Sequence, residues 1–397
     1  MNRNCDIVIA GAGVVGLAMT ALLARLPQSA RLTITLVDAM PPPPANAGDE
    51  IGLRVSAIAA GTMAMFTELG IADPAAVRAC PYRDMRVWDA EADALGPEAL
   101  HFAASEVALG QLGFITEDAL LRHRLYADLE EQAVDLRFGS GIEKLERAGN
   151  AIELTLNDDT ALRADLLVAA DGARSRVRDL AGIDVKSWEY AQSALVTHAQ
   201  PSRSHQHTAW QRFLSDGPIA LLPLLDGRVS IVWSTSPAKV ADLLAADDAT
   251  LGQELTEASD AILGDLQVAA PRASFPLRAQ HAKQYVQHGI ALIGDAAHTV
   301  HPLAGQGANL GLADAAALAR VIELAMDAEE WPGDVSVLRR YERERRGANS
   351  AMLHFIDELN RLFAAGASFS GLRGAGMRLF NRSGPLKRRA MQVAIGL

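Results

Sequence analysis

The sequence predicts a mixed α/β protein built around a Rossmann-like nucleotide-binding domain, with a second, mostly β-sheet domain interleaved into it. Two observations predict this fold. Three glycine-containing motifs begin at Gly11, Asp171 and Gly294, and each follows a short apolar run that is typical of a buried strand. Between these motifs lie stretches with short alternating runs and most of the tryptophans, which indicate a separate sheet.

The motifs divide the chain into discontinuous parts. Residues 1–81, 116–184 and 279–334 are assigned to the nucleotide-binding domain. Residues 82–115 and 185–278 form the predicted sheet domain, and residues 335–397 a helical C-terminal region. This discontinuity separates the chain from a simple two-domain dehydrogenase, which completes its Rossmann unit before a second domain begins.

Hydrophobic periodicity predicts the individual elements. The first 38 residues show a strand–helix–strand pattern over 6–10, 14–26 and 32–37. Asp158-Asp159 marks a hairpin turn. Further helices are predicted over 56–70, 117–134, 308–326 and 335–364, and further strands over 152–156, 164–170, 229–233 and 289–293.

Composition excludes several classes of protein. A formal net charge of −11 argues against nucleic acid as a partner. Two cysteines, Cys5 and Cys80, are too few for a disulfide framework or a zinc site, so no metal site is predicted and a reduced cytoplasmic setting fits. Glycines interrupt the apolar stretch 7–23, and no other run reaches the ~18 residues of a membrane span. We therefore expect a cytoplasmic protein, either soluble or peripheral on the inner membrane.

The C-terminal region is basic. After Glu358 the chain has no aspartate or glutamate. Two interpretations are open: contact with an anionic membrane surface or an acidic partner, or an ordinary solvated terminal helix. The basic residues are Arg361, Arg373, Arg378, Arg382, Lys387, Arg388 and Arg389.

The first glycine motif has the spacing of a dinucleotide fingerprint. In Gly11-Ala-Gly13-Val-Val-Gly16, the first glycine makes a tight turn, the second admits a pyrophosphate and the third lets helix and strand pack closely. Asp38 follows about 20 residues later, at the end of the second strand, where a carboxylate binds ribose hydroxyls. The motif alone does not separate FAD from NAD, and a glycine-rich turn in an unrelated fold is the alternative.

The second and third motifs extend this site. Asp171-Gly172 follows one buried strand and Gly294-Asp295 another; turn formation and helix capping are the simpler interpretations of each. In the third, a proline- and glycine-rich loop leads into a helix, which suits a flavin because glycines let the backbone approach a flat ring. Together the motifs favour FAD as the resident cofactor. Since no second complete fingerprint exists, NADH or NADPH is expected to bind transiently.

The run His301-Pro-Leu-Ala-Gly-Gln-Gly-Ala-Asn-Leu-Gly-Leu-Ala-Asp314 resembles the signature of the ubiquinone-biosynthesis hydroxylases, a branch of the flavin-dependent aromatic monooxygenases. The resemblance covers essentially the whole chain. It is closest to the bacterial 2-polyprenylphenol hydroxylase type acting at ring carbon 5, through Met85–Asp89 and the predicted central sheet, including Gln211–Leu224 and Phe275–Arg278.

The resemblance implies a para-hydroxybenzoate hydroxylase-like FAD-binding domain. Arg54 is assigned to the cofactor only on this resemblance, since a lone arginine is usually a surface charge. Glu117 falls where relatives place a polar residue beside the cofactor, although a first-turn acid of a helix is the alternative. The implied FAD-binding residues are Gly11, Gly13, Gly16, Asp38, Arg54, Asp171, Gly172, Gly294, Asp295, Pro302, Gly305, Gln306 and Gly307.

Two histidines invite a catalytic interpretation. His298 is expected to make a structural hydrogen bond, and His301 is the one candidate catalytic residue. The chain departs from the family at Asp118, where relatives often carry Asn or His, and at the loosely spaced segment Asp49–Arg54. The first departure puts the edge of the substrate pocket in doubt, and not the cofactor.

The reaction that the resemblance implies is hydroxylation of an electron-rich prenylated phenol, using FAD, NADH or NADPH, and O₂. One alternative is the same chemistry on a soluble aromatic compound, which needs a cationic clamp that the sequence does not reveal. Another is a non-catalytic prenyl-binding protein on the same fold, which retention of three cofactor motifs opposes. The expected partners are the phenol and O₂, together with a membrane surface or a complex of ubiquinone-biosynthesis enzymes.

Overall fold

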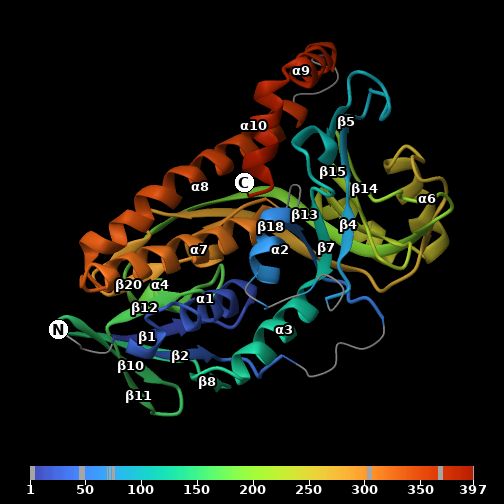
Figure 1. The fold of residues 1–397 in the computed structure, drawn as a ribbon. Coiled ribbons are helices and arrows are strands. Elements are labelled where there is room, and N and C mark those ends of the chain that lie inside the picture. Colours follow the sequence, from blue (N-terminus) through green and yellow to red (C-terminus); the bar gives the residue numbers. More distant parts are fainter. Residues whose placement is uncertain are drawn as a thin grey trace.

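The computed structural model describes residues 5–43, 50–68, 70, 73, 77–301, 306–364 and 370–396. It contains two large sheets joined along the chain, with helices covering the first and a C-terminal group of helices reaching the second (Figure 1). This arrangement has the mixed α/β architecture that the sequence predicts.

A six-stranded sheet carries the three glycine motifs. Its order is β19-β20-β12-β1-β2-β8, and all neighbours are parallel except the β19–β20 pair. The central strands β1, β12 and β20 are almost continuously apolar, because a parallel sheet is covered on both faces. Their carboxyl ends therefore meet at one edge, where ligands of open α/β sheets bind. The strands are β1 (Cys5–Ala10), β2 (Leu32–Asp38), β8 (Val134–Phe138), β12 (Leu166–Ala169), β19 (Val286–Gln287) and β20 (Ile290–Leu292).

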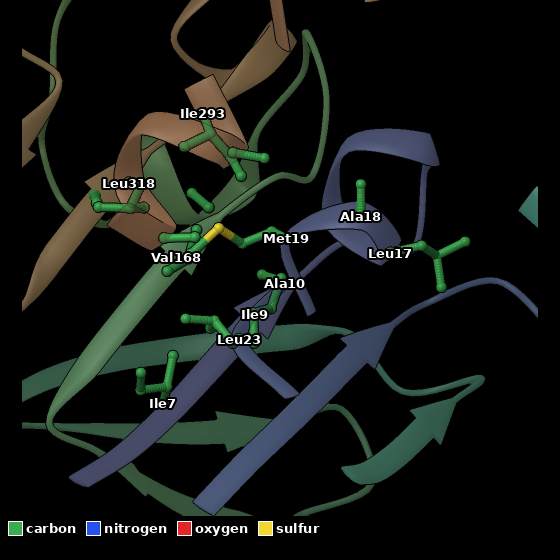
Figure 2. Packing of buried hydrophobic residues seen from close by; sticks show 14 of the residues in the cluster. Ile7, Ile9, Ala10, Leu17, Ala18, Met19, Leu23, Val168, Ile293 and Leu318 are labelled. Carbon is green, nitrogen blue, oxygen red and sulfur yellow. The ribbon is translucent and has the colours of Figure 1, made fainter. Parts of the chain in front are cut away.

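The largest apolar core lies between this sheet and its helices. Helix α1 (Val14–Ala24) packs against α3 (Asp118–Glu130) and α7 (Gln306–Asp327), while α4 (Arg176–Leu180) follows the second motif. Figure 2 shows α1 side chains meeting the sheet and α7. Its labelled core residues are Ile7, Ile9, Ala10, Leu17, Ala18, Met19, Leu23, Val168, Ile293 and Leu318.

The second large sheet has nine strands, in the order β21-β18-β13-β16-β15-β14-β5-β6, with β17 paired to β13. Strand β21 (His298–Thr299) follows the third glycine motif directly, so the two sheets are joined beside that motif. Helices α5 (Pro237–Ala245) and α6 (Asp248–Ala258) pack near β13 and β17. The other strands are β5 (Asp84–Asp89), β6 (Leu100–Ala103), β13 (Val185–Pro201), β14 (Thr208–Leu214), β15 (Gly217–Pro223), β16 (Val229–Thr235), β17 (Leu266–Val268) and β18 (Ala273–Ala282).

Two three-stranded sheets complete the β-structure of the described residues. One has the order β11-β10-β9 and lies beside the six-stranded sheet, and the other has the order β3-β7-β4. Helix α2 (Ala60–Glu68) follows β3 directly. The strands are β3 (Val55–Ala59), β4 (Cys80–Tyr82), β7 (Gly113–Glu117), β9 (Ile142–Ala148), β10 (Ala151–Leu156) and β11 (Ala161–Ala164).

The C-terminal region consists of α8 (Val335–Ala364), α9 (Ser370–Arg382) and α10 (Pro385–Ala394). In Figure 1, α8 runs alongside α7, and the C-terminal end of the chain lies beside α2. Among the residues with a described position, no helix is long and apolar enough to cross a membrane.

The basic C-terminal residues mostly pair within the molecule. Three of them form ion pairs with acids on or next to β5 and β6: Arg373 with Asp89, Arg378 with Glu98 and Lys387 with Glu106. Arg361 pairs with Glu358 on its own helix. Arg382, Arg388 and Arg389 are exposed and form no ion pair with any residue of the described ranges.

Most predicted elements are confirmed within a few residues, and the helix over 335–364 coincides with α8. The helix predicted over 56–70 is wrong at its start, because Val55–Ala59 is a strand and the helix begins at Ala60. Strand β3 pairs along β7, and Asn309 of α7 bonds its backbone at Ala57 and Ala59. These long-range bonds outweigh local helix propensity. The predicted domain boundaries stay predictions.

Candidate functional site

The first glycine motif lies at the carboxyl edge of the six-stranded sheet, between β1 and α1. Gly11 has φ +103°, a backbone conformation that residues with a side chain rarely adopt. Its N–H donates to the Val37 carbonyl at 2.8 Å. A Cβ atom at position 11 would lie 2.4 Å from the Ala170 oxygen, and one at position 16 would lie 1.9 Å from the Gly11 oxygen. Both glycines are therefore required by the packing of the chain itself.

Gly13 differs from its two neighbours in the motif. A Cβ atom at position 13 would meet no protein atom within 4 Å. The fold itself does not require a glycine here, while the open space above the backbone is what a bound pyrophosphate needs. Position 13 also lies at the start of α1, where free N–H groups favour an anion.

Asp38 ends β2 on the same edge. Its carboxylate accepts hydrogen bonds from the backbone N–H groups of Ala12 and Met40. The side chain is thus held beside the glycine motif. On α3, Arg122 donates from Nε to the Ala12 carbonyl at 3.1 Å, a contact that no local sequence signal indicates. Asp38 lies in the position expected of the ribose-binding carboxylate.

The second motif follows β12. Asp171 accepts hydrogen bonds from the Ser175 hydroxyl at 2.5 Å and the Val177 N–H at 3.1 Å, so it organises the start of α4. Burial raises the pKa of its carboxyl, although these hydrogen bonds oppose the shift. Gly172 has φ +82°, and a Cβ atom there would meet nothing within 4 Å, so its backbone conformation is what requires glycine.

The third motif follows β20. Gly294 has φ +59°, and its N–H donates to Oδ2 of Asp314 at 3.1 Å. Asp295 is exposed to solvent, yet many protein atoms lie around its carboxyl, and this desolvation raises its pKa, while His298 and Arg54 oppose the shift. An exposed carboxylate can accept hydrogen bonds from ligand hydroxyl groups.

Two side chains bind the second and third motifs together. Arg178 donates to the carbonyls of Ala173 and Ala296, both at 3.2 Å. Gln280 of β18 donates to the carbonyls of Ala173 at 2.8 Å and Asp295 at 2.9 Å. Sequence reasoning missed Gln280, since an isolated glutamine in an alternating strand carries no signal. The four bonds hold the two motifs in a fixed mutual position.

The Arg54 segment lies near Asp295, since the charge of Arg54 lowers the pKa of the Asp295 carboxyl. The Arg54 side chain is 84% exposed, and its Nε lies 3.8 Å from Oδ2 of Asp118. Glu117 is buried, and its carboxylate accepts from the Gly52 N–H at 2.6 Å and pairs with Arg78 at 2.7 Å. Glu117 makes no capping bond to α3. It therefore anchors the segment that carries Arg54.

The loop after the third motif is described only at its ends. Pro302 and Gly305 lie outside the described residues. Gln306 is the first residue of α7, and a Cβ atom at Gly307 would lie 3.8 Å from a methyl group of Val300. The N-terminus of α7, with its partial positive charge, follows this loop.

His298 has the structural role expected of it. Its Nε2 lies 2.5 Å from Oδ2 of Asp314, and both side chains are fully buried. Asp314 also accepts from Arg345 at 2.8 Å and Asn349 at 3.0 Å. Burial alone raises the pKa of Asp314, but His298 and Arg345 lower it below the ordinary value. This network ties the third motif to α7 and α8.

His301 has a different environment. It is fully buried, and neither ring nitrogen has a hydrogen-bond partner in the described part of the chain. Burial lowers the pKa of His301 to about 4, so the ring is neutral at physiological pH. The Tyr190 ring packs edge-on against it, with 4.9 Å between centroids, and the Tyr190 hydroxyl donates to Asp357 of α8. Among the described residues, both ring nitrogens are therefore open to a further hydrogen bond.

These observations fit one extended dinucleotide cofactor. The three motifs meet at one sheet edge, with open space over Gly13 at one end and the accessible Asp295 at the other. The nine-stranded sheet begins where the third motif ends. An FAD molecule would be held by the first motif at its pyrophosphate and by the third at its flavin end.

The matching protein-family model is an FAD-binding domain and covers residues 4–356. The chain is 38% identical to the 3-demethoxyubiquinol 3-hydroxylase of Escherichia coli (strain K12) over 100% of both chains. It is 36% identical to the ubiquinone hydroxylase UbiL of Rhodospirillum rubrum, over 100% of this chain and 90% of the relative. The human mitochondrial ubiquinone biosynthesis monooxygenase COQ6 is 34% identical, over 98% and 92% of the two chains.

Solved structures show the same fold. PqsL from Pseudomonas aeruginosa, in complex with 2-aminobenzoylacetate, superposes with a TM-score of 0.77 at 24% identity, over 94% of this chain and 99% of that one. The p-nitrophenol 4-monooxygenase PnpA from Pseudomonas putida DLL-E4 gives 0.76 at 17% identity, over 100% and 99%. With FAD as its cofactor, the chain is a flavoprotein monooxygenase and belongs to the FAD-dependent hydroxylase family of ubiquinone biosynthesis.

Proposed function

We propose that this enzyme hydroxylates the aromatic ring of a polyprenylphenol intermediate of ubiquinone biosynthesis, using NADH or NADPH and O₂. The observation that supports the proposal is the junction at β21: the third glycine motif, to which we assign the flavin end of the cofactor, is followed directly by a strand of the nine-stranded sheet. The full-length relatives named as ubiquinone hydroxylases support the substrate class.

The predicted cofactor residues divide the binding of FAD among them. The start of α1 around Gly13 would hold the pyrophosphate, Asp38 the ribose and Asp295 the ribityl chain, and Arg54 would contribute a positive charge near the cofactor. Bound FAD would supply the redox chemistry, in which the nicotinamide is oxidised, one oxygen atom of O₂ enters the ring and the other leaves as water. The α7 N-terminus at Gln306 stabilises negative charge on a ligand bound before it.

His301 is the candidate for direct contact with the reacting groups. As a neutral imidazole without a partner among the described residues, it can accept a hydrogen bond from a phenolic hydroxyl. Its buried position also excludes water from its immediate surroundings. We assign no separate general base, because an electron-rich phenol is already activated toward an electrophilic oxygen.

Two ring positions compete. The family resemblance in the sequence is strongest to hydroxylases that act at ring carbon 5, which is the position we propose. The name of the Escherichia coli relative specifies position 3, and this favours the second candidate. Nuclear magnetic resonance of the isolated product distinguishes the two.

We also propose that the enzyme touches an anionic membrane surface or an enzyme complex through α9 and α10. Arg382, Arg388 and Arg389, which pair with no described acid, lie on these helices together with exposed apolar side chains. If the partner is a membrane, we expect the protein to float with anionic vesicles but not with neutral ones. If it floats with neither, an enzyme complex is the remaining partner. The exposed apolar residues are Leu379, Leu386 and Val393.

The function is tested with purified holoenzyme, a polyprenylphenol and 4-hydroxybenzoate as the soluble comparison. We expect nicotinamide oxidation to rise with the polyprenylphenol only, and mass spectrometry to show a product with one additional oxygen atom. Protein that neither contains nor takes up FAD contradicts the proposal. Hydroxylation of 4-hydroxybenzoate alone contradicts the substrate class.

A further inference from the structure

A recess of about 310 Å³ lies where β13, the β14–β15 turn and the C-terminal part of α8 meet. We call it the β13 recess. Its lining combines polar and charged side chains with aromatic and apolar ones. The aromatic and apolar residues include Trp188, Tyr190, Phe213, Leu214, Pro218 and Phe363.

An irregularity in β13 shapes this recess. The pairing of β13 with β18 shifts between Glu189 and Ser193, so extra residues bulge out of the strand. Within the bulge, Ala191 has φ +52°, an uncommon conformation for a residue with a side chain. Bulges of this kind redirect side chains beside functional sites. Here the bulge lets Tyr190 line the recess while its ring contacts His301.

The recess has a rigid aromatic floor. Phe213 of β14 and Phe363 of α8 stack with their ring centroids 3.9 Å apart and an interplanar angle of 14°. Both are buried, and they belong to an apolar cluster that continues inward to Val300 and Leu310. Those two residues stand on either side of the loop predicted to hold the flavin. One packed apolar cluster therefore connects the floor of the recess to the two ends of that loop.

Two of the charged side chains around this floor are mostly exposed. Arg361 and Glu189 have side chains that are 75% and 74% exposed, and they pair with Glu358 and Arg278. These two charges stand at the rim, where long side chains keep their ends in water while their stems cover apolar surface. Two other charges lie deeper: Asp357 is half-buried and accepts the Tyr190 hydroxyl, and the Arg373 guanidinium lies 5.8 Å from the Phe363 ring centroid.

We propose that the β13 recess binds the isoprenoid chain of the substrate, with Tyr190 as the wall between that chain and His301. The volume is at the low end of the roughly 300–1,000 Å³ of small-molecule sites, so the recess receives part of a ligand. Flat trigonal carbons of an isoprenoid suit the stacked aromatic floor. Tyr190 and Phe213 would then determine specificity for prenylated over short phenols.

This inference rests on the proposed function, and the first experiment compares two substrates. Ser215 is an exposed residue of the β14–β15 turn that lines the recess, and Ser215→Trp fills its mouth. We expect KM for a prenylphenol to rise about tenfold, equivalent to the loss of one or two buried methylene groups, with kcat/KM for the same phenol bearing a methyl group nearly unchanged. Ala238→Trp, at an exposed position on α5, is the matched control.

The second experiment needs neither turnover nor a variant. A prenylphenol carrying a diazirine at the end of its chain is cross-linked to wild-type holoenzyme, and the labelled peptides are identified by mass spectrometry. Labelling within residues 210–218 and 355–363 supports the inference. Labelling confined to other segments overturns it, as does an equal effect of Ser215→Trp on both phenols. If wild-type enzyme hydroxylates neither phenol, the proposed function fails, and the cross-link alone decides whether the recess binds the chain.

Discussion

The three glycines of the first motif are required for different physical reasons. Gly11 and Gly16 are imposed by the protein, because added side-chain atoms would overlap backbone oxygens at 2.4 and 1.9 Å. Gly13 is open toward the cofactor edge. One motif therefore contains two residues needed for folding and one that we propose for cofactor binding, and substitution can separate the two roles.

Alanine substitutions at positions 13 and 16 are expected to behave differently. Gly13→Ala should leave the melting temperature of the FAD-free protein unchanged and weaken FAD binding by about tenfold or more, because the methyl group occupies pyrophosphate space. Gly16→Ala should destabilise the FAD-free protein by ~1–3 kcal/mol through overpacking. Calorimetry and fluorescence titration with FAD measure both effects. Equal melting temperatures for the two variants would contradict this division.

Among the helices and strands, the sequence predicted those elements whose structure depends on neighbouring residues in the chain. Apolar runs and glycine spacing predicted β1, α1 and β2, because a few consecutive residues are enough to specify a buried strand or a tight turn. The prediction for Val55–Ala59 was wrong, since its small apolar residues are compatible with either a helix or a strand. Only the pairing with β7 and the bonds to Asn309 select the strand. The bridge made by Gln280 was equally invisible, because its partners at Ala173 and Asp295 are distant in sequence.

The C-terminal helices show how far composition alone can be read. Their excess of basic residues suggested an external partner, yet three of the cations neutralise acids near β5 and β6. Lys387 is the clearest case: its side chain is 6% exposed, with Nζ 2.7 Å from Glu106 and 5.7 Å from the Phe102 ring centroid. The C-terminal helices therefore have mainly a structural role. Only their arginines that pair with no described acid form a candidate contact surface.

Removing one member of the Lys387–Glu106 pair should cost more than removing both. Glu106→Gln leaves a buried ammonium group without its counter-charge and should destabilise the protein by about 1–3 kcal/mol, while adding Lys387→Met should recover part of the loss. Chemical denaturation and hydrogen exchange across α10 measure these changes. Glu91→Gln, at an exposed acid, is the control. A double variant less stable than Glu106→Gln would show that the charge pair itself stabilises the fold.

For the whole molecule, the central fact is that the cofactor edge is assembled from distant segments. Strands β1, β12 and β20 bring residues near 11, 171 and 294 to one side of a single sheet. A ligand that spans all three stabilises the folded state in proportion to its binding and lowers local opening wherever it contacts the chain.

Binding of FAD should therefore protect three separate stretches from hydrogen exchange: residues 11–16, 171–178 and 294–300. Exchange is compared by mass spectrometry with and without FAD, and Gly13→Ala under the same FAD concentration serves as the control with reduced protection. Protection limited to residues 11–16 would mean that only the nucleotide half of the cofactor contacts the described edge.

The strand order also has a consequence during synthesis on the ribosome. Strand β1 can pair with β2 almost at once, but its other neighbour, β12, is made only after residue 165. At ~5–20 residues per second, one edge of an almost wholly apolar strand waits about 10–30 s for its partner. Unpaired apolar edges aggregate, so slow translation or a shortage of chaperones should reduce the yield of this enzyme before any flavin can bind.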